Sequence, residues 1–235
     1  MKCYRKLEPI KAISFDLDDT LYSNRPNILA ADQKMVAYFQ NVFNSNKTYD
    51  FNYWLPFKQQ ALTQQPELVN DVAEVRIQCY RLGFIAHGFS DEEAFEKSQL
   101  AVDYFVKERS NFSVTSEVHS LLAALQEKYT LISISNGNVN TKAIDIDKYF
   151  ELILHADLTQ KQKPSSDMFD IARKKFNLQA SEILHVGDCG KADIKGAMQA
   201  GFQSAWLPKY NVGKPLSTLP TIELSELSEL RCLLN

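Results

Sequence analysis

From about Ser116 onward, the sequence alternates between short β-rich runs and longer stretches with helical periodicity. The β-rich runs are residues 130–135, 152–155, 182–186 and 203–207. Parallel strands need a crossover connection, which is usually a helix, so this alternation predicts right-handed βαβ units. We therefore expect an α/β protein with a largely parallel sheet covered by helices.

One further apolar run, residues 10–15, lies near the N-terminus and belongs to the same sheet. Between it and Ser116 the rhythm is helical, with candidate helices at residues 28–43, 51–63, 66–82 and 91–108. The later helices are expected at residues 116–128, 139–149, 166–176 and 191–200, with a short terminal helix after residue 223. The sequence thus predicts a Rossmann-like core, residues 1–22 and 111–235, with an inserted α-helical cap, residues 23–110.

The composition argues against several classes of function. A net charge of −3 and the absence of a basic stripe or tail predict no nucleic-acid partner and no acidic-membrane partner. The sequence contains no run of about 18 apolar residues, so we expect no membrane span. No apolar segment follows the basic N-terminus, so we expect no signal peptide. The scattered cysteines Cys3, Cys79, Cys189 and Cys232 fit a reducing cytoplasm.

The first apolar run leads directly into three acidic residues, Asp16, Asp18 and Asp19. Like charges this close repel one another, and burial costs free energy unless a cation or a proton neutralises them. A bound divalent metal would resolve the repulsion and leave one acid to carry a proton. An ordinary acidic turn at a strand end remains the alternative for this stretch taken alone.

Polar residues follow three further strands or β-rich runs. Ser135, Asn136 and Gly137 lie at the end of the run 130–135 and directly after it. Lys163 follows the run 152–155, and Asp188 and Asp193 follow the run 182–186. In a parallel sheet the carboxyl ends of the strands meet at one edge, where ligands bind. Carboxylates from two strands suit Mg²⁺, while a hydroxyl, backbone amides and a lysine suit a phosphate.

These motifs resemble those of the haloacid dehalogenase superfamily. The motifs D-x-D-x-T, S-N-G, K-P and G-D-x-x-x-x-D occur in the family's order over nearly the whole chain, with an insertion like its type-one helical cap. Residues 15–22, 24–26 and 183–188 are similar, more narrowly, to bacterial phosphatases of 5-amino-6-(5-phospho-D-ribitylamino)uracil and of FMN.

The resemblance implies a role for each acid of the first motif. Asp16 would be the nucleophile that forms an aspartyl phosphate. Asp18 would protonate the leaving alkoxide and then act as base for the hydrolytic water. Mg²⁺ would be held by Asp16, the backbone carbonyl of Asp18, and Asp188. Asp19 would serve the local structure.

The resemblance also implies how phosphate is gripped. Ser135, the amides of Asn136 and Gly137, and the hydroxyl of Thr20 would contact phosphate oxygens. Lys163 would pair with Asp16 and the transferring group. Lys161 would face solvent.

Two positions refine this reading. Many relatives have a second acid where Cys189 stands, so we expect Asp193, five residues after Asp188, to lie outside the metal's ligands and orient the metal site or Lys163. Whether Asp193 touches the ion, and what Cys189 does, stay open.

Asp18 favours a phosphatase or phosphomutase over a dehalogenase, because halide leaves without a proton. His185 is expected to be a hydrogen-bonded core residue.

We therefore expect a Mg²⁺-dependent phosphomonoesterase acting on a small phosphorylated metabolite of the riboflavin pathway. The alternatives are a nucleotide or sugar-phosphate phosphatase, a phosphomutase, or a catalytically silent phosphate-binding protein. Aromatic residues of the cap are expected mainly to pack its core, the alternative being that they stack a flavin or pyrimidine ring. The sequence leaves open whether the protein is a monomer or a dimer.

Overall fold

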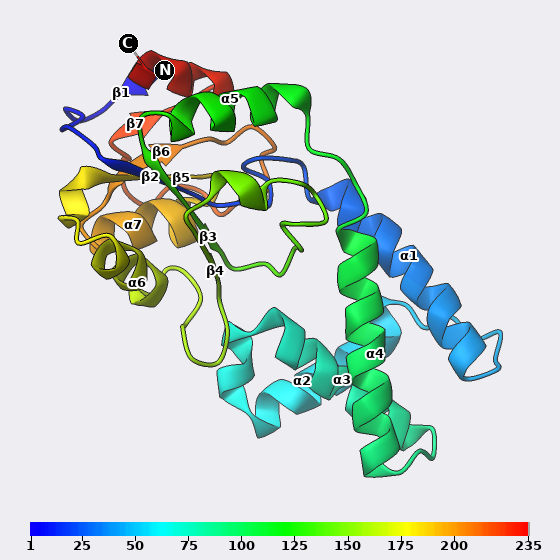
Figure 1. The fold of residues 1–235 in the computed structure, drawn as a ribbon. Helices are drawn as coiled ribbons and strands as arrows, with labels where there is room; N and C mark the ends of the chain where they lie inside the picture. Colours follow the sequence, from blue (N-terminus) through cyan, green and yellow to red (C-terminus); the bar gives the residue numbers. More distant parts are fainter. Residues whose placement is uncertain (235) are drawn as a thin grey trace.

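The protein is described by a computed structural model that places residues 1–234. Its centre is a sheet of seven strands in the order β1-β7-β6-β5-β2-β3-β4 (Figure 1). All neighbouring strands are parallel except β1 and β7. The strands are β1 (Lys2–Cys3), β2 (Ala12–Phe15), β3 (Thr130–Ser135), β4 (Leu152–His155), β5 (Ile183–Gly187), β6 (Gln203–Trp206) and β7 (Ile222–Glu223). The predicted α/β class is confirmed.

The sheet is covered on both faces, as buried parallel strands require. β2 and β5 are buried along their whole length. One face packs on α5 (Ser116–Gln126) and the 3-10 helix η5 (Leu227–Leu234), through a cluster that includes Phe15 and Leu122. The other face packs on α6 (Asp167–Lys175) and α7 (Gly196–Gln199), through a cluster that includes Ile132 and Phe169. Figure 1 shows the two layers on opposite sides of the strands.

Four long helices are inserted between β2 and α5. They project away from the sheet (Figure 1) and pack around their own buried side chains, among them Phe39, Trp54, Tyr80 and Phe84. We call these helices the cap. The domain boundaries predicted after residues 22 and 110 stay predictions. The helices are α1 (Arg25–Val42), α2 (Phe51–Gln64), α3 (Val72–Ala86) and α4 (Asp91–Arg109).

The helix predicted over residues 66–82 is wrong in its course. A short 3-10 helix, η1 (Pro66–Asn70), is followed by α3, and the two are separated by Asp71 in an extended conformation. The Asp71 carboxylate accepts hydrogen bonds from the amides of Ala73 and Glu74, so this residue caps α3. The local side-chain bonds therefore start a new helix instead of continuing the old one.

The helix predicted over residues 139–149 is also wrong. This segment consists of turns and a 3-10 helix, η2 (Asp147–Tyr149). The Asn140 side chain accepts hydrogen bonds from the amides of Lys142 and Ala143, and Asp145 has a left-handed φ of 58°. Side-chain bonds to the backbone compete here with a continuous helix.

The helix predicted over residues 191–200 begins differently. Its first part is a π-helical segment, η4 (Gly190–Lys195), which continues into α7. The amides of Asp193 and Ile194 both reach the carbonyl of Cys189, at 2.9 and 3.2 Å. Gly201, with a left-handed φ of 81°, follows the end of the helix. Wide turns of this kind occur frequently at functional sites.

The edge of the sheet formed by β1 and β7 is absent from the sequence prediction, since strands of two residues carry no periodic signal. The predicted terminal helix is the 3-10 helix η5. Within residues 1–234, no helix is both long enough and apolar enough to cross a membrane.

Candidate active site

The predicted site residues follow the carboxyl ends of neighbouring strands. In the register of the sheet, Phe15 of β2 lies opposite Ser133 of β3 and Val186 of β5. The Asp16 amide continues the β2–β5 ladder by donating to the Val186 carbonyl at 2.9 Å. Asp16 and the residues that follow β3 and β5 are therefore held at one edge of the sheet by backbone hydrogen bonds.

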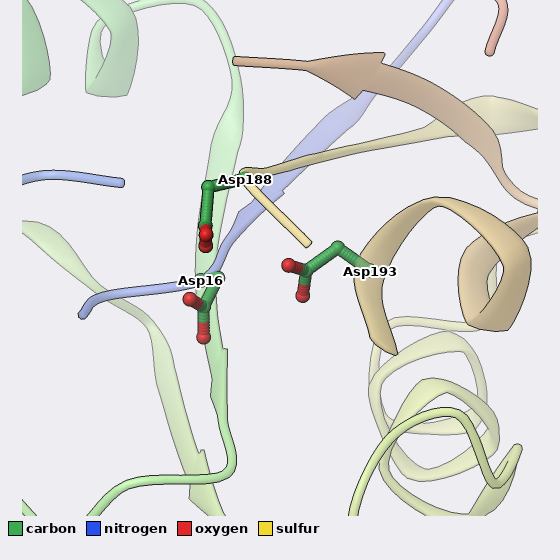
Figure 2. A group of neighbouring side chains, drawn as sticks. All are labelled: Asp16, Asp188 and Asp193. Carbon is green, nitrogen blue, oxygen red and sulfur yellow. The ribbon is translucent and has the colours of Figure 1, made fainter. Parts of the chain in front are cut away.

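Three carboxylates meet at this edge. Each of Asp16, Asp188 and Asp193 offers an oxygen within 4.8 Å of the other two (Figure 2), and all three side chains are buried. Asp16 and Asp188 extend directly from strand ends, whereas Asp193 comes from the π-helical segment η4. Three of the acids that the sequence placed in one site, Asp16, Asp188 and Asp193, are thus brought together.

Lys163 is the positive charge of this group. Its Nζ lies 2.8 Å from Asp16 Oδ1 and 2.7 Å from Asp193 Oδ1, and it also donates to the Ile134 carbonyl. The side chain is buried. Burial alone would lower the pKa of Lys163, but the charges of Asp16 and Asp193 outweigh it and raise this pKa. Lys163 therefore carries its charge at the catalytic edge at any ordinary pH.

The site holds more negative than positive charge, because three carboxylates face one lysine. Burial raises the pKa of Asp16 well above its usual value, although the Lys163 charge opposes this. Burial, with the charges of Asp193 and Asp19, raises the pKa of Asp188 to about 7. In both carboxyl groups, burial disfavours the ionised form more than the Lys163 charge favours it. Oxygen ligands with an excess of negative charge fit a hard divalent ion such as Mg²⁺.

Asp193 is already bound on both oxygens. Oδ1 contacts Lys163 and lies 3.2 Å from Nε2 of His185, and Oδ2 accepts a hydrogen bond from the Cys189 amide at 2.9 Å. Against the effect of burial, the charge of Lys163 and the contact with His185 lower the pKa of Asp193. This carboxylate holds Lys163 in place. That it also orients the metal stays a prediction.

His185 and Cys189 are part of the support. His185 is fully buried inside β5, where its other ring nitrogen, Nδ1, lies 2.9 Å from the Ser14 hydroxyl. This is the hydrogen-bonded core residue that the sequence indicated. The Cys189 sulfur accepts from the amides of Ala192 and Lys214, at 3.4 and 3.3 Å. Cys189 thus connects η4 to the segment that contains Lys214.

The loop after β3 is arranged around its own side chains. Gly137 donates its amide to the Ser135 hydroxyl at 3.1 Å. The Asn136 side chain donates to the Lys163 carbonyl at 3.0 Å and accepts from the Lys163 amide at 2.7 Å. Asn136 therefore fixes the loop that carries Lys163. The predicted phosphate contacts of Ser135, Asn136 and Gly137 stay predictions.

Thr20 and Asp19 shape the turn after the first motif. Thr20 is buried, and its Oγ1 has no hydrogen-bond partner among the described residues. Asp19 has a left-handed φ of 58° and accepts the Asn24 amide at 2.9 Å. The structural role expected for Asp19 fits these contacts.

The Asp18 side chain lies in a different cluster, around a residue that sequence reasoning missed. Arg109, the last residue of α4, donates through Nη2 to both Asp18 oxygens, at 2.7 and 3.1 Å. Tyr22 donates its hydroxyl to Asp18 Oδ1 at 2.8 Å. A lone arginine in the last turn of a helix is an ordinary feature, so no sequence signal distinguished this one.

The cap contains a cavity of about 390 Å³ between α1, α2 and α3. The α1 wall of the cavity begins at Ile28, whose amide donates to the Asn24 carbonyl at 3.0 Å. Asn24 in turn donates its amide to Asp19 of the first motif. The α3 wall of the cavity follows Asn70, whose side chain accepts from the Gln162 amide at 3.4 Å, next to Lys163. The cavity is lined by apolar and aromatic side chains together with the charged residues Asp32, Asp50, Lys58 and Arg76.

Comparison with known proteins covers both the sheet and the cap. Residues 10–201 match the family model of the haloacid dehalogenase-like hydrolases. The 5-amino-6-(5-phospho-D-ribitylamino)uracil phosphatase YigB of Escherichia coli (strain K12) is 35% identical over 239 residues, with 100% of each chain covered. A phosphoglycolate phosphatase of Vibrio parahaemolyticus is 31% identical, with 95% of each chain covered.

The solved structures agree with this result. A 2-haloacid dehalogenase from Pseudomonas syringae pv. Tomato DC3000 superposes with a TM-score of 0.89 at 26% identity, over 96% of this chain and 98% of that chain. The shared architecture therefore includes the cap helices as well as the sheet.

Proposed function

This chain belongs to the haloacid dehalogenase-like hydrolases and is a phosphatase, and from this premise we propose a Mg²⁺-dependent phosphomonoesterase that works through an aspartyl phosphate at Asp16. The observation that carries the proposal is the contact of Lys163 with Asp16 at 2.8 Å, beside the further buried carboxylates Asp188 and Asp193. A carboxylate nucleophile that attacks a dianionic phosphate needs positive charge close to it.

In the first step, an Asp16 oxygen attacks phosphorus as the bond to the leaving oxygen breaks. Lys163 keeps its charge beside Asp16, and the amides of Asn136 and Gly137 with the Ser135 and Thr20 hydroxyls would bind the phosphoryl oxygens. Mg²⁺, held by Asp16, the backbone carbonyl of Asp18, and Asp188, would supply further positive charge when bound.

Asp18 handles the proton in both steps. It donates to the leaving alkoxide in the first, and it accepts a proton from the water that hydrolyses the phospho-aspartate in the second. A dehalogenase has no use for this proton, because halide leaves as an anion. The acid at position 18 therefore favours phosphate-ester chemistry in this chain, although one structural neighbour is a 2-haloacid dehalogenase.

We propose 5-amino-6-(5-phospho-D-ribitylamino)uracil as the substrate, with FMN as the second choice. The support is the full-length relative that acts on this compound. The volume of the cap cavity falls in the range of pockets that hold small organic ligands, and the cavity is lined by cap residues, with none of the predicted catalytic or metal residues among them. The phosphoglycolate phosphatase relative keeps a smaller substrate as the alternative. Four free cysteines support a reducing cytoplasm.

The test of the activity is phosphate release from p-nitrophenyl phosphate, FMN and the riboflavin precursor, with Mg²⁺ and with EDTA. We expect turnover that needs Mg²⁺ and that is lost in Asp16→Asn. Full activity of Asp16→Asn would contradict the covalent mechanism, and no release from any ester would favour a silent phosphate-binding protein.

The substrate proposal has its own test in the cavity. Asp32→Asn removes a charge from the cavity wall without changing the shape of the side chain. We expect kcat/KM for the riboflavin precursor to fall about tenfold, since a hydrogen bond to a charged group contributes about 1.5–3 kcal/mol, and p-nitrophenyl phosphate to be unaffected. Asp103→Asn, an exposed position on α4, is the control. Equal rates with the precursor would remove the cavity from the substrate site.

A further inference from the structure

Arg109 is a buried arginine at the point where the cap returns to the sheet. Its side chain is 3% exposed. Besides Asp18, the guanidinium contacts Asn138 through Nη1 at 2.7 Å and Asn24 through Nη2 at 3.2 Å. Burying a charged group costs free energy unless it is paired and hydrogen-bonded. These contacts with Asp18, Asn24 and Asn138 are what compensates the burial of Arg109.

The contacting residues come from three different parts of the site. Asn24 precedes α1, where the chain leaves the sheet for the cap, and Arg109 ends α4, where the chain returns. Asn138 follows the predicted phosphate loop of residues 135–137. One side chain therefore joins both crossings between sheet and cap to the phosphate loop and to Asp18.

The position of Asp18 depends on these contacts. Its carboxylate lies so close to Gly137 that a Cβ atom on that glycine would overlap Asp18 Oδ2, and the same Cβ would lie 3.5 Å from Arg109 Nη1. Arg109 Nη2 alone donates to both Asp18 oxygens, and contact with both oxygens restricts the orientation of a carboxylate more than contact with one of them does. Asp18 is thus aimed at the loop expected to bind the phosphoryl group.

We propose that Arg109 is the positioning residue for Asp18, and that it acts only through the aim of that carboxylate. This inference rests on the proposed function, because it concerns the acid and base of the same reaction. Arg109 touches neither the nucleophile Asp16 nor the acids Asp188 and Asp193 among its recorded contacts. It therefore affects the proton transfers to the leaving oxygen and from the attacking water, and leaves substrate binding to other residues.

A double-mutant cycle tests whether Arg109 acts through Asp18. Arg109→Gln, Asp18→Asn and the double variant are assayed with p-nitrophenyl phosphate, whose leaving group departs without a proton, so that Asp18→Asn keeps a measurable rate and the cycle reports on the second step, in which Asp18 accepts a proton from the hydrolytic water. We expect Arg109→Gln to lower kcat about 10- to 100-fold, less than the about 100- to 10,000-fold that general acid–base catalysis contributes, because the carboxylate is displaced and not removed; KM should change little. The double variant should be no slower than Asp18→Asn alone.

If the two losses multiply in the double variant, or if Arg109→Gln raises KM with kcat unchanged, the proposal is wrong. Arg109→Lys keeps the charge but not the planar fork. It should give an intermediate kcat and serves in the same cycle if the Gln variant does not fold, as judged by thermal unfolding. Arg81→Gln is the control, since Arg81 also binds both oxygens of an aspartate, donating through Nε and Nη2 to Asp91 on the cap surface; it should retain the wild-type kcat.

The assay of Asp16→Asn, run beside this cycle, separates the inference from the proposed function. If wild-type protein hydrolyses the ester with Mg²⁺ and Asp16→Asn does not, the proposed function stands whatever Arg109 does. If Asp16→Asn is as active as wild type, the proposed function fails, and the cycle then reports on Asp18 in some other chemistry.

Discussion

The protein contains two buried ionic clusters at the carboxyl edge of its sheet, and they differ in charge balance. In the first, Lys163 faces three acids, Asp16, Asp188 and Asp193. In the second, Arg109 faces the single acid Asp18. The first cluster has more acids than cations. In the second, one cation is paired with one acid, and Arg109 Nε has no hydrogen-bond partner among the described residues. An excess of acids suits a place where metal and phosphate bind, and a paired charge suits a place where a side chain must be held in position.

Removing the cation of the first cluster should have the largest effect. Lys163→Met leaves Asp16 and Asp193 buried without their partner. We expect the free energy of unfolding to fall by about 3–5 kcal/mol, the cost of breaking a buried ion pair, and turnover to fall at least about 1,000-fold, as for loss of a main electrostatic group. Thermal unfolding and phosphate release measure the two effects.

Lys161→Met provides the matched control, because Lys161 is exposed two residues away. It should change neither quantity. A Lys163→Met protein with wild-type stability in EDTA would mean that these acids are protonated together in the folded protein and that the lysine does not balance them.

The charge excess also predicts how the metal-free protein responds to pH. The pKa of Asp188 is raised to about 7 in the folded protein, against about 3.9 when unfolded. Between these values the folded state binds more protons than the unfolded state, so stability falls as pH rises from about 4 to about 7. The loss is at most about 4 kcal/mol. Chemical unfolding at pH 5 and pH 7.5 in EDTA measures it.

Mg²⁺ should remove this pH dependence by taking the place of the proton. Asp188→Asn should remove the contribution of Asp188, because an asparagine side chain does not titrate, and should leave a smaller dependence of the same sign from Asp16, whose pKa is also raised by burial. A metal-free wild-type protein that is more stable at pH 7.5 than at pH 5 would show that another group, and not Asp188, dominates the linkage.

The two clusters also differ in how far the sequence could predict them. The residues of the first follow strand ends, and strands with long apolar runs are readable: β3 and β4 have the predicted bounds. Once Asp16, Lys163 and Asp188 are placed after parallel strands, their convergence follows from the topology. The contact of Arg109 with Asp18 joins residues 91 positions apart through a helix end, and no periodicity carries that information.

Errors in the fold have a similar cause. The helices predicted over residues 66–82 and 139–149 fail where Asp71 and Asn140 bind nearby backbone amides with their side chains. Their sequences are compatible with a helix or with a local turn, and the choice depends on three-dimensional context. Ser90 and Glu93, in contrast, form a capping box at the start of α4, and the predicted start of that helix at residue 91 is correct.

Loss of Asn138, which accepts a hydrogen bond from Arg109, should lower kcat less than loss of Arg109 itself. Asn138→Ala removes the acceptor for Nη1 at 2.7 Å and leaves the contacts with Asp18 in place. We expect kcat to fall about tenfold, since an unpaired buried charged group costs more than about 1 kcal/mol and the guanidinium loses part of its orientation. Steady-state kinetics of Asn138→Ala in the wild-type and Arg109→Gln backgrounds measures this. The substitution should have no effect once Arg109 is absent.

The smallest effect is expected from Tyr22, the other donor to Asp18. Tyr22→Phe removes the hydroxyl and keeps the ring packed against Phe112, at 4.7 Å between centroids. Loss of one hydrogen bond of about 1 kcal/mol should lower kcat about fivefold in the wild-type background. In Arg109→Gln the same substitution should cost more, because Tyr22 is then the remaining recorded donor to the carboxylate. A Tyr22→Phe effect as large as that of Arg109→Gln would mean that the phenol, and not the guanidinium, holds Asp18.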